Sequence, residues 1–148
     1  MMSLTQRINE DIKVAMKAKD KETLKVIRML KAALQKEQIE QTEPLSEEQE
    51  ITIIAREMKQ RKDSLAEFEK AGRQDLVAPL LDEIKIVEQY LPAQLSEDEI
   101  KEAITKIIAA VGAKDKSAFG AVMGKAMAEL KGQADGQVVN RIVKELLS

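Results

Sequence analysis

The chain has 148 residues, of which 44% are hydrophobic and 34% charged, and its formal net charge is −2. This mixture favours a soluble, folded, helix-rich protein over a disordered one. Because cysteine and histidine are both absent, disulfide bonds, thiolate nucleophiles, Cys/His zinc sites and a Ser-His-Asp triad are excluded.

The hydropathy pattern predicts no membrane partner. No run of about 18 apolar residues occurs, and the opening stretch MMSLTQRINED carries acidic residues where a secretory signal would be apolar. We therefore expect a cytoplasmic protein, and no pattern in the sequence indicates a cofactor or a metal ion.

Apolar residues that recur every three or four positions predict helices from the start of the chain. Ser3 and Asp20 are placed to cap the first two helices, and Ser46 with Gln49 forms a capping box before the third. Gly72 is a typical C-terminal cap for that third helix. The three apolar stripes consist of Leu4, Ile8, Ile12 and Ala15; Val26, Ile27, Leu30, Ala33 and Leu34; and Ile51, Ile54, Met58, Leu65 and Phe68.

Arg61 occupies a position of the third predicted helix where the heptad rhythm calls for a core residue. We favour an arginine at the edge of the core, with its aliphatic stem on apolar surface and its guanidinium in water. A functional, buried arginine is the alternative.

Pro79 interrupts the apolar pattern of the fourth predicted helix. A proline in a helix interior costs about 3 kcal/mol or more. We therefore predict that this helix starts near Leu76 to Ala78, so that Pro79 lies in the first turn.

Pro92 and the capping box of Ser96 and Glu99 mark the strongest boundary in the chain. Three further helical stripes follow, of which the first ends at Gly112. No segment alternates at period two, so the sequence predicts an all-α protein with seven main helices. We expect an N-terminal domain of about four helices, residues 1–94, and a C-terminal three-helix bundle, residues 95–148, near the lower size limit for independent folding.

The stretch LKGQADGQVVN joins the last two predicted helices. Gly132 suits a left-handed C-terminal cap, and Asp135 suits the N-cap of the final helix. These two residues explain a plain helix corner without any function.

Gly120, Gly124 and Ala128 lie four apart on one face of the sixth predicted helix. Each helical glycine costs about 1 kcal/mol relative to alanine, so we expect something to approach this backbone closely. A tightly packed neighbouring helix is the favoured interpretation, and a ligand backbone such as RNA is the alternative.

Basic residues near this face form a candidate RNA-binding patch. From Leu95 to Ser148 the sequence has eight basic and eight acidic residues, so only a local patch could attract phosphates. Asp135 would repel a phosphate at the start of the last helix. The patch consists of Lys125 and Lys131, which flank the glycine face, and Arg141 and Lys144 on the last helix.

Four stretches resemble the YqeY family in their order and spacing, over nearly the whole chain. They are VIRMLKAALQKEQIE, REMKQRKDSLAEFEKAGRQDLV, EQYLPAQLSEDEI and GAVMGKAMAELKGQADGQVVN. In that family the C-terminal bundle is similar to the tail of the GatB subunit of the tRNA-dependent amidotransferase. The resemblance implies a GatB/YqeY-type bundle at roughly residues 96–148 that contacts the outer corner of tRNA.

The same resemblance supplies the candidate site. By position, it implies RNA contacts at Lys125, Lys131, Gly132, Gln133, Gly136 and Asn140. The family is often labelled with carbon–nitrogen ligase activity that uses glutamine as amido-N-donor. We assign no catalytic residue, because the chain has neither a glycine-rich phosphate cradle nor a nucleophile elbow.

We favour a tRNA- or translation-associated accessory protein whose partners are tRNA and an amidotransferase or other translation proteins. A glutamine-dependent amidotransferase component is one alternative, so the enzymatic character stays open. A protein-interaction module that does not bind RNA, using Arg61 and the KQRKDS run, is the other.

Overall fold

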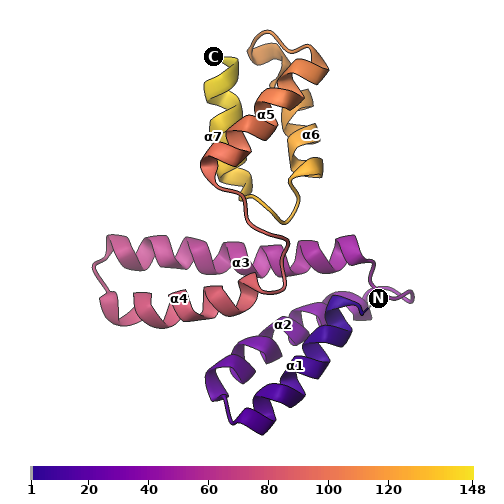
Figure 1. The fold of residues 1–148 in the computed structure, drawn as a ribbon, viewed down its shortest axis with the longest axis vertical. Coiled ribbons are helices and arrows are strands. Elements are labelled where there is room, and N and C mark those ends of the chain that lie inside the picture. Colours follow the sequence, from indigo (N-terminus) through magenta and orange to yellow (C-terminus); the bar gives the residue numbers. More distant parts are fainter. Residues whose placement is uncertain (1) are drawn as a thin grey trace. The chain divides into compact units, whose positions relative to one another are not determined.

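The computed structural model describes residues 2–148, and within that range the chain forms seven α-helices, one short 3-10 helix and no strand. The predicted all-α class and the seven main helices are confirmed. The chain divides into two compact units, an N-terminal unit that ends at Leu91 and a C-terminal unit, Pro92–Ser148 (Figure 1). Whether each unit folds as an independent domain, as predicted for residues 1–94 and 95–148, stays a prediction.

The N-terminal unit consists of two helical hairpins, α1–α2 and α3–α4 (Figure 1). Its first three helices begin at the predicted caps, since the side chains of Ser3 and Ser46 accept backbone hydrogen bonds in capping boxes and Asp20 accepts from Thr23. Gly72, just beyond the third helix, has a φ of +69°. The bounds are Leu4–Ala18 for α1, Lys21–Ile39 for α2, Glu47–Lys70 for α3 and Gln74–Glu88 for α4.

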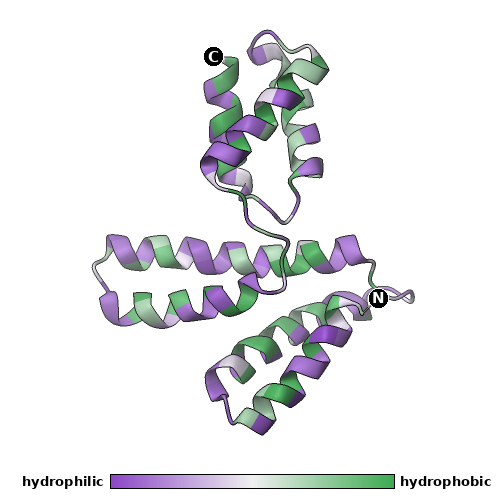
Figure 2. Ribbon diagram, viewed as in Figure 1, coloured by the Kyte–Doolittle hydropathy of each residue, from purple (hydrophilic) through white to green (hydrophobic). Residues whose placement is uncertain are grey.

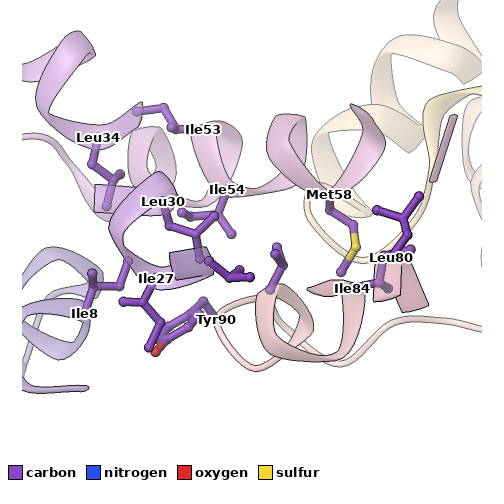
Figure 3. Close-up of a cluster of buried hydrophobic side chains, with 12 residues drawn as sticks. Ile8, Ile27, Leu30, Leu34, Ile53, Ile54, Met58, Leu80, Ile84 and Tyr90 are labelled. Atoms are coloured by element: carbon purple, nitrogen blue, oxygen red, sulfur yellow. The ribbon is translucent and has the colours of Figure 1, made fainter. Parts of the chain in front are cut away.

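Twelve buried side chains drawn from all four helices and from Tyr90 form the core of this unit (Figure 3). Because aromatic residues are scarce, this core is built from branched aliphatic side chains and one methionine. The cluster comprises Ile8, Val26, Ile27, Leu30, Leu34, Ile53, Ile54, Met58, Leu80, Ile84, Val87 and Tyr90.

Arg61 is buried, so the predicted position at the edge of the core is wrong. Only 7% of its side chain is exposed, and its Nη1 and Nε atoms lie 3.2 Å and 3.3 Å from carboxylate oxygens of Glu57 and Glu83. Nη1 also donates to the Glu57 carbonyl at 3.0 Å. The two carboxylates compensate the guanidinium charge, which is the condition for burying it.

Pro79 lies beyond the first turn of α4, so the predicted helix start is also wrong. The helix begins at Gln74, which makes Pro79 its sixth residue. Arg73 is the N-cap residue but makes no side-chain cap hydrogen bond; its guanidinium Nη2 lies 3.0 Å from Asp75 in an exposed ion pair. The helix therefore tolerates one missing backbone hydrogen bond in its second turn.

The C-terminal unit is a three-helix bundle with an entirely aliphatic buried core. The glycine that ends α5, Gly112, has a φ of +75°, as the predicted cap requires. In the first and last helices of the bundle, hydrophobic residues line one side and hydrophilic residues the other (Figure 2). The elements are α5, Glu97–Val111; the 3-10 helix η1, Lys116–Ala118; α6, Phe119–Glu129; and α7, Gly136–Leu147. The core comprises Ile100, Ile104, Ile107, Val122, Ala126, Leu130, Val139, Ile142, Val143 and Leu147.

Candidate functional site

The corner between α6 and α7, residues 130–135, contains two of the predicted site features. Gly132 has a φ of +76°, a conformation that costs other residues roughly 1–2 kcal/mol. The Asp135 carboxylate accepts from the Gln137 N–H at 2.8 Å and caps α7. The predicted left-handed glycine and the predicted N-cap are both confirmed.

Two residues from the segment before α5 are attached to this corner by hydrogen bonds that the sequence did not predict. The Gln94 Nε2 atom donates to the Gly132 carbonyl at 2.6 Å, and the Leu95 N–H donates to the Gln133 carbonyl at 2.9 Å. We call this pair of bonds the Gln94–Leu95 staple. No local pattern indicates it, because the partners lie 38 residues apart in the sequence.

The glycine face of α6 is open, which contradicts the favoured prediction of a tightly packed neighbouring helix. Gly120, Gly124 and Ala128 are all exposed. A Cβ atom built at either glycine would meet nothing within 4 Å. Within the part of the chain that the structure describes, no contact therefore explains why these positions are glycine.

Lys125 and Lys144 are exposed cations for which residues 2–148 provide no ion-pair partner. At 3.6 residues per turn, Lys125 lies about 100° around α6 from Gly124, at the border of the open face. Lys131, at the start of the corner, is exposed as well. These three lysines are the positions at which the unit could meet phosphate groups.

Arg141 differs from Lys125 and Lys144 because it is paired twice. Its Nη2 atom lies 2.5 Å from the Glu97 carboxylate, and its Nη1 atom lies 3.2 Å from Glu145. Both pairs are about half exposed, so they contribute little to stability. They nevertheless compensate the charge, and Arg141 is therefore a weaker candidate for phosphate contact than Lys125 or Lys144.

Gly136 and Asn140 lie on α7. A Cβ atom at Gly136 would come within 3.3 Å of the Met127 Cε atom, so glycine here lets the start of α7 approach α6. Asn140 is half-buried, and its side chain makes no hydrogen bond within the described residues. The corner glycines thus have structural roles, whereas Asn140 keeps its hydrogen-bonding groups available.

Neither a metal centre nor a membrane span emerges from residues 2–148. They contain no group of three or more Asp and Glu residues placed to hold a metal ion. No helix in this range combines the length and the apolar character needed to cross a bilayer. The candidate site consists of the open α6 face, the corner and the exposed lysines Lys125, Lys131 and Lys144.

Comparison with known proteins finds a family match over almost the whole chain. The family described as "Yqey-like protein" matches residues 5–147. A relative from Pyrenophora tritici-repentis, "Altered inheritance of mitochondria protein 41, mitochondrial", is 28% identical over 146 residues, which cover 95% of this chain and 79% of the relative. The protein of the same name from Kluyveromyces lactis is 35% identical over 104 residues, or 68% of this chain and 56% of that protein.

A second group of relatives consists of glutamyl-tRNA(Gln) amidotransferase subunits, which share only a short stretch with this chain. The one from Methanobrevibacter smithii is 47% identical over 55 residues, which make up 34% of this chain and 9% of that protein. The one from Thermococcus gammatolerans is 32% identical over 81 residues, which make up 52% of this chain and 13% of that protein. Because the first group carries a mitochondrial name, the expected cytoplasmic location stays a prediction.

Proposed function

The chain belongs to the YqeY-like family, and from this membership we propose that it is a translation-associated accessory protein whose C-terminal unit binds tRNA. The proposed contact surface combines the open α6 face with the corner and with Lys125, Lys131 and Lys144. Asn140 supplies hydrogen-bonding groups at the edge of this proposed contact surface. In this proposal the chain presents a binding surface and performs no chemistry itself.

The observation that carries the proposal is the open glycine face of α6. Gly124, inside α6, weakens the helix by about 1 kcal/mol relative to alanine, and Gly120, in the first turn, weakens it by up to that amount. Nothing within 4 Å of their Cβ positions makes use of the missing side chains. A nucleic-acid backbone lying along the helix would explain the two glycines. A phosphate–sugar chain can come closer to the helix backbone at a glycine than at any residue that carries a side chain.

Kinship with the amidotransferase subunits supports tRNA as the ligand. The stretch that is 47% identical covers only 9% of the Methanobrevibacter protein. A short shared module of this kind is better explained by binding than by the whole reaction of the larger enzyme. Because that protein is named for glutamyl-tRNA(Gln), we propose tRNA rather than another RNA.

The charge balance predicts a weak, salt-sensitive interaction. The region from Leu95 to Ser148 is neutral, and Arg141 is engaged by Glu97 and Glu145. Only a few lysines can therefore neutralise phosphates. Each such contact makes the slope of log affinity against log salt more negative by about 0.7–0.9, so we expect a slope of about −2.

The decisive experiment is the double substitution Gly120→Ala/Gly124→Ala. Because both positions are open, the variant should be more stable than the wild type by about 1–2 kcal/mol in urea unfolding. If tRNA lies along this face, the same variant should bind tRNA at least about tenfold more weakly, since about 1.4 kcal/mol lost at the contact is tenfold. A more stable variant with unchanged affinity for labelled deacylated tRNA, measured by fluorescence anisotropy, would contradict the proposal.

A charge-reversal pair provides the matched control. Lys125→Glu/Lys144→Glu should weaken tRNA binding. It should also make the slope of log affinity against log salt less steep, by the contribution of about two phosphate contacts. Lys101→Glu/Lys106→Glu makes the same change of charge on α5, outside the proposed surface. Equal losses in the two variants would show that only the net charge of the unit matters.

Amide transfer is the alternative that the relatives' names favour. It predicts glutamine hydrolysis when the pure chain is mixed with glutamyl-tRNA, ATP and glutamine. Release of ammonia above the level of a protein-free control would establish that alternative and overturn a purely binding role.

A further inference from the structure

We propose that Gln94 is a positioning residue for tRNA binding: through the Gln94–Leu95 staple it fixes the α6–α7 corner in the conformation that the RNA meets. This inference rests on the proposed function of the C-terminal unit. It concerns a residue that lies outside the corner and outside the predicted contact set.

The corner is held in part by its own hydrogen bonds. Between Leu130 and Asp135 the Gln133 N–H donates to the Leu130 carbonyl at 2.9 Å, and Asp135 caps α7. Gly132 and Gly136 lie on either side of the Asp135 cap, and glycine loses more conformational freedom on folding than any other residue. A segment of this kind needs an external attachment to hold one conformation.

The staple supplies that attachment at two consecutive carbonyl groups. Gln94 holds the Gly132 carbonyl at 2.6 Å, and the Leu95 N–H holds the Gln133 carbonyl at 2.9 Å. A single hydrogen bond would leave the corner free to rotate about it, whereas two adjacent bonds define both position and orientation. The orientation of the corner decides where Lys131 and the start of α7 point.

Gln94 acts through the corner rather than by direct contact. A glutamine amide has two N–H donors, and the Gln94 Nε2 atom already lies 3.1 Å from the Pro92 carbonyl and 2.6 Å from the Gly132 carbonyl. Both donors are engaged, and the residue is half-buried. The side chain therefore has no donor left for a phosphate.

The test compares four variants of the full chain: Gln94→Ala, Gln94→Glu, Ile107→Val and Gln89→Ala. The first two remove the donors, and the glutamate keeps the shape of the side chain. Ile107→Val trims the buried core of the same unit and serves as a control for a general loss of stability. Gln89→Ala, at an exposed glutamine whose side chain makes no hydrogen bond within the described residues, controls for the substitution itself.

Two readouts are expected to move together. Amide hydrogen exchange at residues 131–136 should become about 3–10-fold faster in both Gln94 variants, because a hydrogen bond of ordinary strength is lost. Affinity for labelled deacylated tRNA should fall by about the same factor in Gln94→Ala, while its salt slope stays unchanged because no phosphate contact is removed. Gln94→Glu also adds a negative charge to the unit, so its affinity should fall at least as far. Ile107→Val and Gln89→Ala should leave the affinity unchanged.

Each other outcome is decisive. If Gln94→Ala binds tRNA like the wild type, Gln94 is not a positioning residue although the proposed function stands. If Ile107→Val weakens binding as much as Gln94→Ala, the effect is a general loss of stability and the inference is overturned. If the wild type itself does not bind tRNA, the proposed function fails and this inference fails with it.

Discussion

The two units use different means to define one packed state. The N-terminal unit buries two charged residues, Glu50 and Arg61, and provides each with partners. The Glu50 carboxylate accepts from the N–H and the hydroxyl of Thr5 at 2.9 Å and 2.7 Å. Among the described residues of the C-terminal unit no charged side chain is buried, and its part-buried side-chain hydrogen bond to a distant residue, from Gln94 to Gly132, lies at the corner.

This difference shows how the size of a unit limits its chemistry. Burying a charge carries a desolvation cost that paired hydrogen bonds only offset, so a core with such groups needs enough apolar area elsewhere. The four-helix unit has that area, and its charged groups define how α1, α3 and α4 pack. The small bundle uses all of its buried positions for apolar side chains, because small domains bury a lower fraction of their surface.

The largest expected effect comes from one identical substitution in each unit. Ile54→Ala and Ile104→Ala both remove a fully buried isoleucine, at a cost of about 3–4 kcal/mol. The small bundle should then unfold within the intact chain, whereas the N-terminal unit should remain folded. Hydrogen exchange resolved by helix would measure this. If the amides of α5–α7 remain protected from exchange in Ile104→Ala, the bundle withstands the loss of a buried isoleucine as well as the larger unit does.

A smaller effect is expected when the buried arginine is replaced by an apolar residue. Arg61→Met leaves the carboxylates of Glu57 and Glu83 without their cation, and both are only partly exposed. We expect a loss of about 2–3 kcal/mol in urea unfolding. The triple variant with Glu57→Gln and Glu83→Gln should recover most of it. No recovery would show that packing of the arginine stem, rather than its charge, is what the core requires.

The smallest effect concerns the capping boxes. The boxes of the N-terminal unit use Gln6 and Gln49, whereas that of the C-terminal unit uses Glu99. Hydrogen bonds from the Ser96 backbone and side chain hold the pKa of Glu99 below its ordinary value of 4.5. The folded carboxylate binds its proton less readily than the unfolded one, so its contribution is complete above about pH 5 and is lost as the pH falls below that value.

Glu99→Gln should therefore leave the stability of the N-terminal unit unchanged at every pH. Only the stability of α5 should differ from the wild type. The stability gap between variant and wild type should narrow between about pH 5 and pH 3. Urea midpoints at several pH values would measure it. A gap that is constant over this range would mean that the charge of Glu99 is irrelevant to the cap.

Much of the fold could be predicted because its signals are local. Capping residues such as Ser46 and Asp135, and the glycine at 132, depend on backbone geometry within a few residues, and these predictions are confirmed. Helix periodicity likewise depends only on neighbours along the chain. Pro79 was misplaced because the helix extends one turn before it, to Gln74, so that the preference of proline for the first turn does not decide where α4 begins.

The features that could not be predicted depend on partners distant in sequence. Arg61 is buried because Glu83 reaches it from another helix, and Arg141 is neutralised by Glu97, which lies 44 residues away. The open face of α6 is a similar case, since spacing alone cannot show whether another helix covers it. The contacts of Lys125, Lys131, Gln133 and Asn140 with RNA stay predictions.

Tyr90 gives the chain an optical property that follows from its packing. It is the only tyrosine, and there is no tryptophan, so near-ultraviolet absorption comes almost entirely from this phenol. The ring is buried, its hydroxyl donates to Asp11 at 2.5 Å, and the Arg7 guanidinium lies 4.7 Å from the ring centroid. Burial, together with the hydrogen bond to Asp11, raises the pKa of Tyr90 far above its ordinary value of 10. In strong alkali the red-shifted phenolate band should therefore appear only as α1 separates from the residues that follow α4, which makes this one chromophore a native reporter of a contact between the two hairpins.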